Sequence, residues 1–335
     1  MADKFNKIYQ ESIQNPEKFW QNVSEDIFWF KKPSKILNKS KPPFYKWFED
    51  GVTNTCYNAI DTHVDQGNGD KTALIYDSPI TNNKAKFTYN ELRNRVSKFA
   101  GALDNQGIKK GDRVIIYMPM IPEAVIAMLA CGRIGAIHSV VFGGFASNEL
   151  ASRIDDSKAK ILITASCGFE PGRTVEYRPL VDGALKLAKH KVEKVIFFQR
   201  KDHEVKLNSP LEISWEESLI NAKDKDCVEI GANEFAYILY TSGTTGIPKG
   251  IVRDVGGHIV ALKWTMKNIY NVDKNDVWWS ASDIGWIVGH SYIVYAPLFK
   301  GCTTVLFEGK PVGTPDAGVF WLSLIHISEP TRQIV

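Results

Sequence analysis

The sequence of 335 residues has little net charge and few cysteines. Its 41 lysine and arginine residues against 38 aspartate and glutamate residues leave a formal charge of +3. That excess is too small to indicate nucleic acid or an anionic membrane as a partner. The five cysteines lack the CxxC or Cys/His spacing of a metal site, so we expect reduced thiols and no metal ligands. They are Cys56, Cys131, Cys167, Cys227 and Cys302.

Long apolar runs are missing as well. No stretch holds eighteen uninterrupted apolar residues, and residues 1–7 have neither an apolar signal core nor Arg-rich amphipathic character. We therefore expect a cytoplasmic protein with no membrane partner. The content of 44% hydrophobic and 24% charged residues indicates a globular chain, and its length suggests about two domains.

From Phe87 onward, short apolar segments alternate with helical patterns. Thr88 and Glu91 form a capping box before a helical stripe that Gly107 ends. This alternation predicts an α/β fold, in which a parallel sheet carries helices on both faces and binds ligands outside the carboxyl ends of its strands. The expected strands are 113–117, 137–141, 161–164, 194–198 and 237–240, and the helices between them are 122–133, about 148–156 and about 180–188.

The first 60 residues or so are rich in aromatic residues and lysine but show no sustained period. So many exposed aromatic side chains would form a large apolar patch. We therefore expect this region to pack on the main body as a lid or wrap. The aromatic groups are Phe19-Trp20, Phe28-Trp29-Phe30 and Phe44-Tyr45-Lys46-Trp47-Phe48.

A phosphate-binding loop is predicted between Tyr240 and Gly250. The segment holds three glycines, four Ser or Thr hydroxyls and Lys249, directly after an apolar strand pattern. Glycines let backbone N–H groups turn toward an anion, hydroxyls add donors, and lysine supplies a point charge. The loop differs from a Walker A motif because Pro248 and Gly250 stand where that motif has glycine and Ser or Thr. A plain Gly/Thr linker is the alternative.

This loop resembles the signature of the adenylate-forming enzymes. Segments 140–145 and 283–292 are similar to the short-chain acyl-CoA synthetase branch of that family. Within the branch, segments 166–173 and 308–316 are most similar to the propionate-activating members.

The resemblance covers roughly residues 5–321 and implies a fold. It implies the family's large N-terminal α/β domain, a doubly wound arrangement of parallel sheets with helices on both faces, here incomplete and without the small C-terminal domain. The implied parts are an acetyl-CoA-synthetase-type N-terminal region at 1–62 and an AMP-binding domain at 63–321.

The resemblance also implies a two-step reaction. A carboxylate attacks the α-phosphate of ATP to give acyl-adenylate and pyrophosphate, and the CoA thiolate then displaces AMP. Charge neutralisation is what such a displacement needs from the protein, with Mg²⁺ carried largely by ATP. Lys249 and Thr244 are the implied catalytic residues. The implied ATP ligands are Thr241, Ser242, Gly243, Thr244, Thr245, Gly246 and Lys249.

The implied acyl site is an apolar wall with a gap at its glycine. It consists of Trp286, Ile287, Val288 and Gly289. Val288 stands where acetate-specific members carry a hydroxyl residue, which favours propionate, although one methylene is worth only about 1–3 kcal/mol of discrimination. Acetate stays the alternative, and a buried core segment would show the same apolar pattern. His290 is expected to be a hydrogen-bonded structural residue, because an ionised carboxylate needs no base.

Four residues are implied as contacts to the nucleotide end of CoA: Phe142, Gly143, Gly144 and Arg173. Glycines permit close backbone approach, and arginine pairs well with phosphate. Glu170 stands where the family commonly has a second arginine, which puts one phosphate contact in doubt. For the glycine pair alone, a plain strand-to-helix turn is the alternative.

The sequence has two rival interpretations. A dehydrogenase would need a GxGxxG turn after an early strand, and Gly143-Gly144-Phe145 does not supply one. A nucleotide-binding chain without catalysis is the rival outside enzymology. The partners expected in each case are small molecules, and the sequence leaves the oligomeric state open.

The resemblance stops at Leu322. Residues 322–332 can be back-translated to a sequence that resembles a transposase-based sequencing adapter read in frame, so we expect residues 322–335 to be a non-native tail. The family's later acidic residue near Mg²⁺, its ribose-binding aspartate and its C-terminal lysine then have no counterpart here. The resemblance therefore implies that this chain is inactive, or nearly so, alone.

Overall fold

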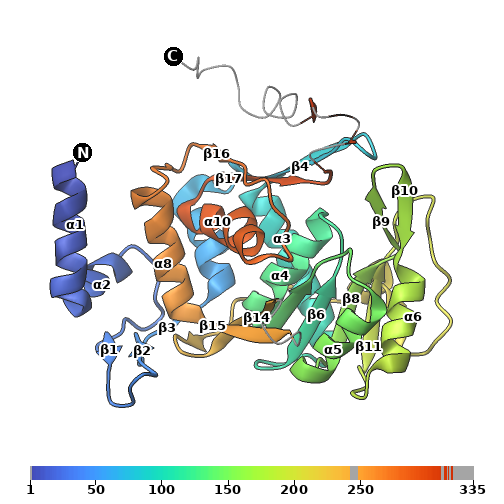
Figure 1. The fold of residues 1–335 in the computed structure, drawn as a ribbon, viewed down its shortest axis with the longest axis horizontal. Helices are drawn as coiled ribbons and strands as arrows, with labels where there is room; N and C mark the ends of the chain where they lie inside the picture. The colour runs from blue at the N-terminus through green and yellow to red at the C-terminus, as the bar shows by residue number, and fades with distance from the viewer. Residues whose placement is uncertain (1, 242–247, 311–312, 315, 317, 320–335) are drawn as a thin grey trace.

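The computed structural model describes residues 2–241, 248–310, 313, 314, 316, 318 and 319 (Figure 1). Its largest sheet has seven strands in the order β12-β11-β8-β6-β7-β14-β15, and all neighbours are parallel except β14 and β15. The strands are β6 (Arg113–Tyr117), β7 (Ile137–Val141), β8 (Ile161–Ala165), β11 (Lys194–Phe198), β12 (Glu212–Ser214), β14 (Phe235–Thr241) and β15 (Lys249–Asp254).

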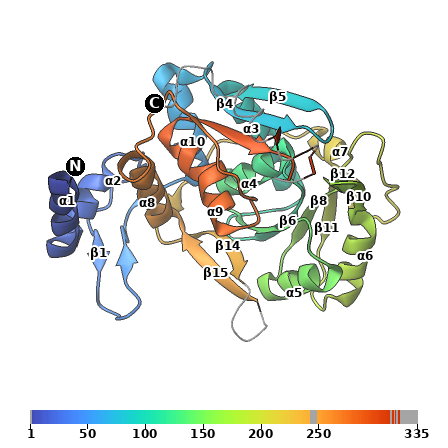
Figure 2. The same cartoon turned by 45° about the horizontal axis from the view of Figure 1, so that its top comes forward.

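The predicted parallel sheet is confirmed, but its last strand was missed. Strand β15 returns antiparallel beside β14, so the Gly/Thr loop connects a hairpin, which extends away from the helices (Figure 2). Strand β14 still runs parallel to β7. The end of β14 at Thr241 therefore lies at the same edge as the carboxyl ends of the other parallel strands, where such folds bind ligands.

Helices cover both faces of this sheet. Helix α4 connects β6 to β7 in one direction along the sheet, whereas α5 and α6 follow crossovers in the other direction, and right-handed crossovers then put them on opposite faces. The helices are α3 (Tyr89–Asn105), α4 (Pro122–Ile134), α5 (Ser147–Ser157), α6 (Tyr177–Leu187), α7 (Trp215–Leu219), α8 (Val255–Asn268), α9 (Ile287–Gly289) and α10 (Ala296–Lys300), with π-helical turns η1 (Tyr57–Asp61), η2 (Val64–Asn68) and η3 (His290–Tyr295).

A second sheet has four strands in the order β16-β17-β4-β5 and lies at the top of Figure 1. Its neighbours are parallel except β4 and β5. Helix α3 begins at the end of β5, where Thr88 and Glu91 make the predicted capping box. The strands are β4 (Thr72–Ser78), β5 (Asn83–Thr88), β16 (Val277–Trp278) and β17 (Thr303–Phe307).

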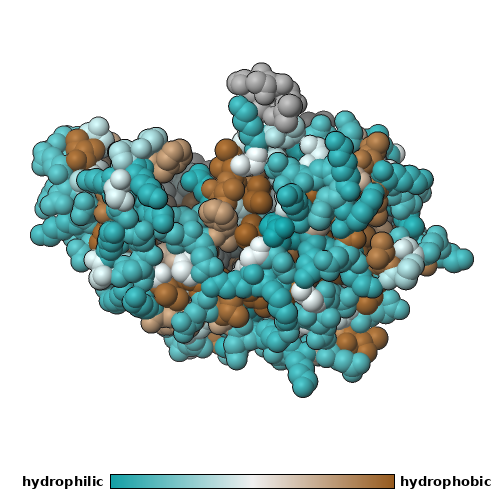
Figure 3. Space-filling model, turned by 90° about the horizontal axis from the view of Figure 1, so that it is seen from below, coloured by the Kyte–Doolittle hydropathy of each residue, from teal (hydrophilic) through white to brown (hydrophobic). Residues whose placement is uncertain are grey.

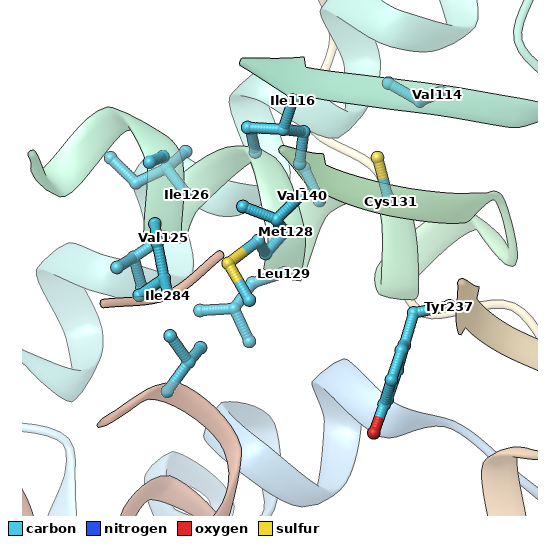
Figure 4. Close-up of a cluster of buried hydrophobic side chains, with 14 of the residues drawn as sticks. Val114, Ile116, Val125, Ile126, Met128, Leu129, Cys131, Val140, Tyr237 and Ile284 are labelled. Atoms are coloured by element: carbon cyan, nitrogen blue, oxygen red, sulfur yellow. The ribbon is translucent and has the colours of Figure 1, made fainter. Parts of the chain in front are cut away.

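The centre of the core lies between helix α4 and strands β6 and β7 (Figure 4). Helix α4 is apolar around nearly its whole circumference, and a helix of that kind has to be buried on all sides. The side chains that meet there include Val114, Ile116 and Val140 from the strands and Val125, Ile126, Met128 and Leu129 from the helix.

The N-terminal region packs on the body only in part. Phe19 and Trp20 each pack on Trp264 of helix α8 with ring centroids 6.0 Å apart, as expected of a wrap. In contrast, Phe5 is 67% exposed and Phe44 is 81% exposed, so the expectation is wrong for those segments. The elements here are α1 (Ala2–Gln14), α2 (Pro16–Ser24), β1 (Leu37–Asn38), β2 (Lys46–Trp47) and β3 (Val52–Thr53), which pairs with β13 (Ile230–Gly231).

None of the described helices combines the length and hydropathy needed to span a lipid bilayer. Figure 3 shows one face of the molecule, which is mostly hydrophilic, with hydrophobic residues gathered near its middle and at its edges.

Candidate functional site

A cavity of about 210 Å³ lies where the carboxyl ends of strands from both sheets meet. Met120 follows β6, Phe142 to Gly144 follow β7, and Glu308 to Lys310 follow β17. Because ligands of α/β folds bind outside the carboxyl ends of the strands, this cavity is the leading candidate for a substrate site.

The predicted residues Phe142, Gly143 and Gly144 line this cavity. A Cβ built at Gly143 would lie 2.1 Å from the hydroxyl oxygen of Tyr177, so glycine is required there by packing. The space beside Gly143, where CoA was expected to approach the backbone, is therefore occupied by the Tyr177 side chain. Tyr177, which sequence reasoning missed, is buried and stacks on Tyr117 with ring centroids 4.8 Å apart.

Arg173 does not line the cavity. It lies on β10 (Arg173–Glu176), which pairs with β9 (Cys167–Glu170), and its side chain is 70% exposed. Its Nη2 donates to Glu170 Oε2 at 2.7 Å and its Nε to the same oxygen at 3.1 Å. A phosphate would have to compete with this carboxylate for the guanidinium. Glu170, which stands in place of the expected second arginine, therefore also pairs with the first one, Arg173.

The predicted acyl wall lies beside the cavity rather than in it. Trp286 packs its ring 5.7 Å from that of Phe142, between centroids, but Trp286, Ile287 and Val288 are each about half exposed. The expected gap at Gly289 is wrong: a Cβ there would lie 1.9 Å from the carbonyl oxygen of Asp283, so backbone already fills that space. The glycine serves the tight packing of segment 283–289 on itself.

Asp283 is a further cavity residue that the sequence did not single out. Its Oδ1 accepts the backbone N–H of Gly285 at 2.8 Å, and burial raises the pKa of its carboxyl. Lys310 lines the same cavity and holds its ammonium 5.2 Å from the centroid of the Phe142 ring. The cavity therefore offers aromatic and glycine surface together with groups of both charge signs.

The phosphate loop is only partly described. The predicted ligands Ser242, Gly243, Thr244, Thr245 and Gly246 lie outside the described residues. Thr241 and Lys249, one on each side, are register partners in the β14–β15 pair, and both are exposed.

The base of the loop is anchored through Tyr240. Its hydroxyl donates to Asp156 Oδ2 at 2.7 Å, and the Arg153 guanidinium lies 5.3 Å from its ring centroid. Of the described part of the loop, neither Thr241 nor Lys249 lines the cavity described above.

His290 is a buried structural residue, as predicted. Its Nε2 lies 3.0 Å from Nε2 of His138 on β7, and Tyr295 places its hydroxyl 3.1 Å from the same His138 nitrogen. Burial holds the pKa of His290 well below its ordinary value and lowers that of His138 to about 3. Both rings are therefore neutral at pH 7, and they connect strand β7 to the segment that follows the acyl wall.

A buried ion pair joins the two sheets at the cavity floor. Arg200, after β11, donates Nη1 to Glu308 Oε1 at 2.7 Å and Nη2 to Oε2 at 3.1 Å. The hydroxyl of Tyr76 on β4 also donates to Glu308. Both charged side chains are less than a tenth exposed.

Substituting Glu308 with alanine is expected to lower the free energy of unfolding by about 3–5 kcal/mol, because it leaves the Arg200 guanidinium buried without a counter-charge. Urea unfolding measures the change. Glu25→Ala is the matched control, since it removes a carboxylate paired with Lys32 on the surface and should cost no more than about 1 kcal/mol. Equal costs for the two substitutions would contradict the structural role of Glu308.

The absence of metal ligands stays a prediction, although one group of potential ligand atoms comes together in the fold. Cys56, Asp61 and Cys227 bring their ligand atoms within 4.8 Å of one another, and they form the one such group found among the described residues. This group could not be predicted from residue spacing, because the two cysteines lie on distant segments that the fold brings together. Two thiols are soft ligands and do not suit Mg²⁺.

A model described as AMP-binding enzyme matches residues 61–331, and one described as acetyl-coenzyme A synthetase N-terminus matches residues 5–59.

Several curated relatives are similar over nearly the whole chain. Identity is 54% over 319 residues to the rat protein called acyl-CoA synthetase short-chain family member 3, mitochondrial (95% of this chain, 47% of the relative). It is also 54% over 321 residues to the human protein of that name (96% and 47%). The acetyl-coenzyme A synthetase of Xylella fastidiosa is 44% identical over 325 residues (95% and 50%). The chain thus spans about half the length of these relatives.

Proposed function

The chain belongs to the family of AMP-binding enzymes, and on that basis we propose that it supplies the large domain of an ATP-dependent acyl-CoA ligase for short-chain carboxylates. The carboxylate would attack the α-phosphate of ATP, releasing pyrophosphate and forming an acyl-adenylate. The CoA thiolate would then attack the acyl carbon, forming the thioester and releasing AMP.

The observation that carries this proposal is the position of the cavity and loop in the fold. Phe142 to Gly144 follow β7, and the predicted phosphate loop follows β14, its neighbour in the sheet. The cavity residues and the end of β14 lie at the carboxyl edge of the sheet, where a nucleotide and a second substrate can meet. Catalysis by this chain's own groups would be electrostatic, with Lys249 and the loop hydroxyls holding the departing pyrophosphate.

Mg²⁺ is proposed to arrive with the ATP phosphates. The loop offers hydroxyls and a lysine, which suit phosphate oxygens, and the one three-ligand group among the described residues contains thiols. No dedicated protein cage for the cation is therefore part of the proposal.

Propionate is the proposed acyl substrate, and acetate is the second candidate. The apolar Val288 favours the longer acid, whereas one relative carries the name acetyl-coenzyme A synthetase. Val288 is 52% exposed, so the described residues do not close a pocket around an acyl tail. Because a methylene is worth only about 1–3 kcal/mol, we expect a preference rather than an absolute choice.

We propose small-molecule partners only and a cytoplasmic location. The small net charge supports the first point. The names of the rat and human relatives include the word mitochondrial, which favours a different location for those proteins.

The test is ATP–pyrophosphate exchange with acetate, propionate and butyrate. We expect little exchange by this 335-residue chain, which spans about half the length of its relatives, and propionate-preferring exchange by a protein extended to their full length. Robust exchange by the shorter chain would overturn its proposed inactivity. No exchange by the extended protein with any of the three acids would overturn the proposed function.

A further inference from the structure

Two cysteines that are far apart in the sequence face each other beneath the N-terminal region. The sulfur atoms of Cys56 and Cys227 lie within 4.8 Å of each other. The short antiparallel pair of β3 and β13 matches Thr53 with Ile230. Strand β3 ends at Thr53 and the chain is helical from Thr55, so the strand pairing brings the two segments together and the helical turn after β3 places the Cys56 thiol.

Hydrogen bonds hold both segments on either side of the thiols. Asn54 donates its Nδ2 to the carbonyl oxygen of Val228 at 2.8 Å, and the Val228 N–H donates to the Arg133 carbonyl at 2.9 Å. The sulfur atoms are therefore kept close by neighbouring contacts.

Two charged residues contact the thiols from opposite sides. Arg133 Nη1 lies 3.5 Å from Cys56 Sγ, whereas Asp61 Oδ2 accepts from Cys227 Sγ at 3.5 Å. The Arg133 guanidinium is thus a hydrogen-bond donor to the Cys56 sulfur. Burial holds the pKa of the Cys227 thiol well above its ordinary value. The two sulfurs are thus unequal.

Access is unequal as well. Cys56 is fully buried, whereas Cys227 is partly exposed. A reagent in solution therefore reaches Cys227 first, and Cys56 stands behind it as the resolving thiol.

We propose that Cys56 and Cys227 are a disulfide-forming modification site that reacts by exchange with low-molecular-weight disulfides such as oxidised glutathione. Because burial disfavours its thiolate form, Cys227 reacts slowly: it first loses its proton to solvent, and its sulfur then attacks one sulfur of oxidised glutathione, which forms a mixed disulfide and releases one glutathione thiolate. The Cys56 thiolate then attacks the Cys227 sulfur and releases the second. The protein loses two electrons and two protons, and one oxidised glutathione becomes two reduced ones.

A divalent cation is a weaker occupant of the same cluster. Arg133 donates to both carboxylate oxygens of Asp61, Nη1 to Oδ2 at 2.7 Å and Nη2 to Oδ1 at 2.9 Å. A metal ion would have to take one of these oxygens and sit beside the guanidinium, whose charge repels it. Disulfide formation leaves the ion pair intact.

Oxidised glutathione added to the folded 335-residue chain tests the proposal, with peptide mapping by mass spectrometry under non-reducing conditions. We expect one cross-linked peptide pair containing Cys56 and Cys227, two glutathione molecules formed for each cross-link, and full reversal by dithiothreitol. The cross-link closes a long loop, so the oxidised chain should also melt about 5 °C higher.

Cys227→Ser should abolish the cross-link, and Cys302→Ala, at a buried thiol that donates to the Asp273 carbonyl, should leave it unchanged. Three outcomes would overturn the proposal: a mixed disulfide at Cys227 that is never resolved, five thiols that stay reduced, or zinc bound by the purified chain at the two sulfurs. None of these readouts depends on acyl-CoA ligase activity, so the proposed function and the thiol site stand or fall separately.

Discussion

Lys249→Ala is expected to lower acyl-adenylate formation by about a hundredfold or more in the protein extended to the length of its relatives. Lys249 begins strand β15 at the end of the predicted phosphate loop and is exposed. Across the described residues no carboxylate forms an ion pair with it, so its charge is available to a phosphate. ATP–pyrophosphate exchange at saturating propionate measures the loss.

Two further variants make that result specific. Lys249→Arg keeps the positive charge and should retain more exchange than alanine, though less than lysine, because the fork geometry of arginine differs. Lys267→Ala removes an exposed lysine from helix α8 and should leave exchange unchanged. Near-normal exchange by Lys249→Ala would show that the loop does not hold the departing pyrophosphate.

Acidification from pH 7 to pH 5 is expected to lower the free energy of unfolding by several kcal/mol. Burial lowers the pKa of His63 to about 4 and that of His138 and His258 to about 3, and it holds the pKa of His290 well below its ordinary value. In the unfolded chain these rings titrate near pH 6.5. Urea unfolding at intervals of half a pH unit follows the effect.

The sign follows from proton binding. Below pH 6.5 the histidines of the unfolded chain bind protons, whereas the buried rings of the folded chain stay neutral. The stabilisation present above pH 6.5 is therefore lost as the pH falls toward the pKa values of the folded state. Each histidine contributes up to about 1.4 kcal/mol per pH unit. Asp254 and Asp283 act in the opposite direction, because burial raises the pKa of their carboxyls.

His258 offers a direct check on this assignment. Its ring lies among Tyr237, Tyr295 and Phe299, and neither ring nitrogen has a hydrogen-bond partner among the described residues. His258→Phe should reduce the loss of unfolding free energy between pH 7 and pH 5 by the contribution of one histidine. His203→Asn, at an exposed histidine, should leave that loss unchanged. Stability that is constant between pH 7 and pH 5 in the unsubstituted chain would contradict the prediction.

Local patterns in the sequence predicted most of the central elements. The strands at 113–117, 137–141 and 194–198 have the predicted bounds, and the Thr88–Glu91 capping box is present. These predictions succeeded because a buried strand, a cap and a helical stripe are each decided by residues a few positions apart.

Strand β15 could not be predicted in the same way. Its residues are mostly exposed and show no buried alternation, and they form a strand because β14 offers an unpaired edge. The contents of the cavity were equally hidden. Tyr177 fills the space over Gly143, and a backbone carbonyl fills the expected gap at Gly289, and both contacts join residues that sequence patterns treat separately.

The sequence by itself determined the α/β alternation, the glycine and hydroxyl loop ending at Lys249, and the family to which these motifs point. Such features depend on residue types at short spacings. Only the tertiary structure decided that Arg173 pairs with Glu170, that Arg200 and Glu308 join the two sheets, and that Cys56 meets Cys227. Those pairings depend on how the strands pair and on how the two sheets pack. Neither can be predicted from the sequence spacing of the residues that pair.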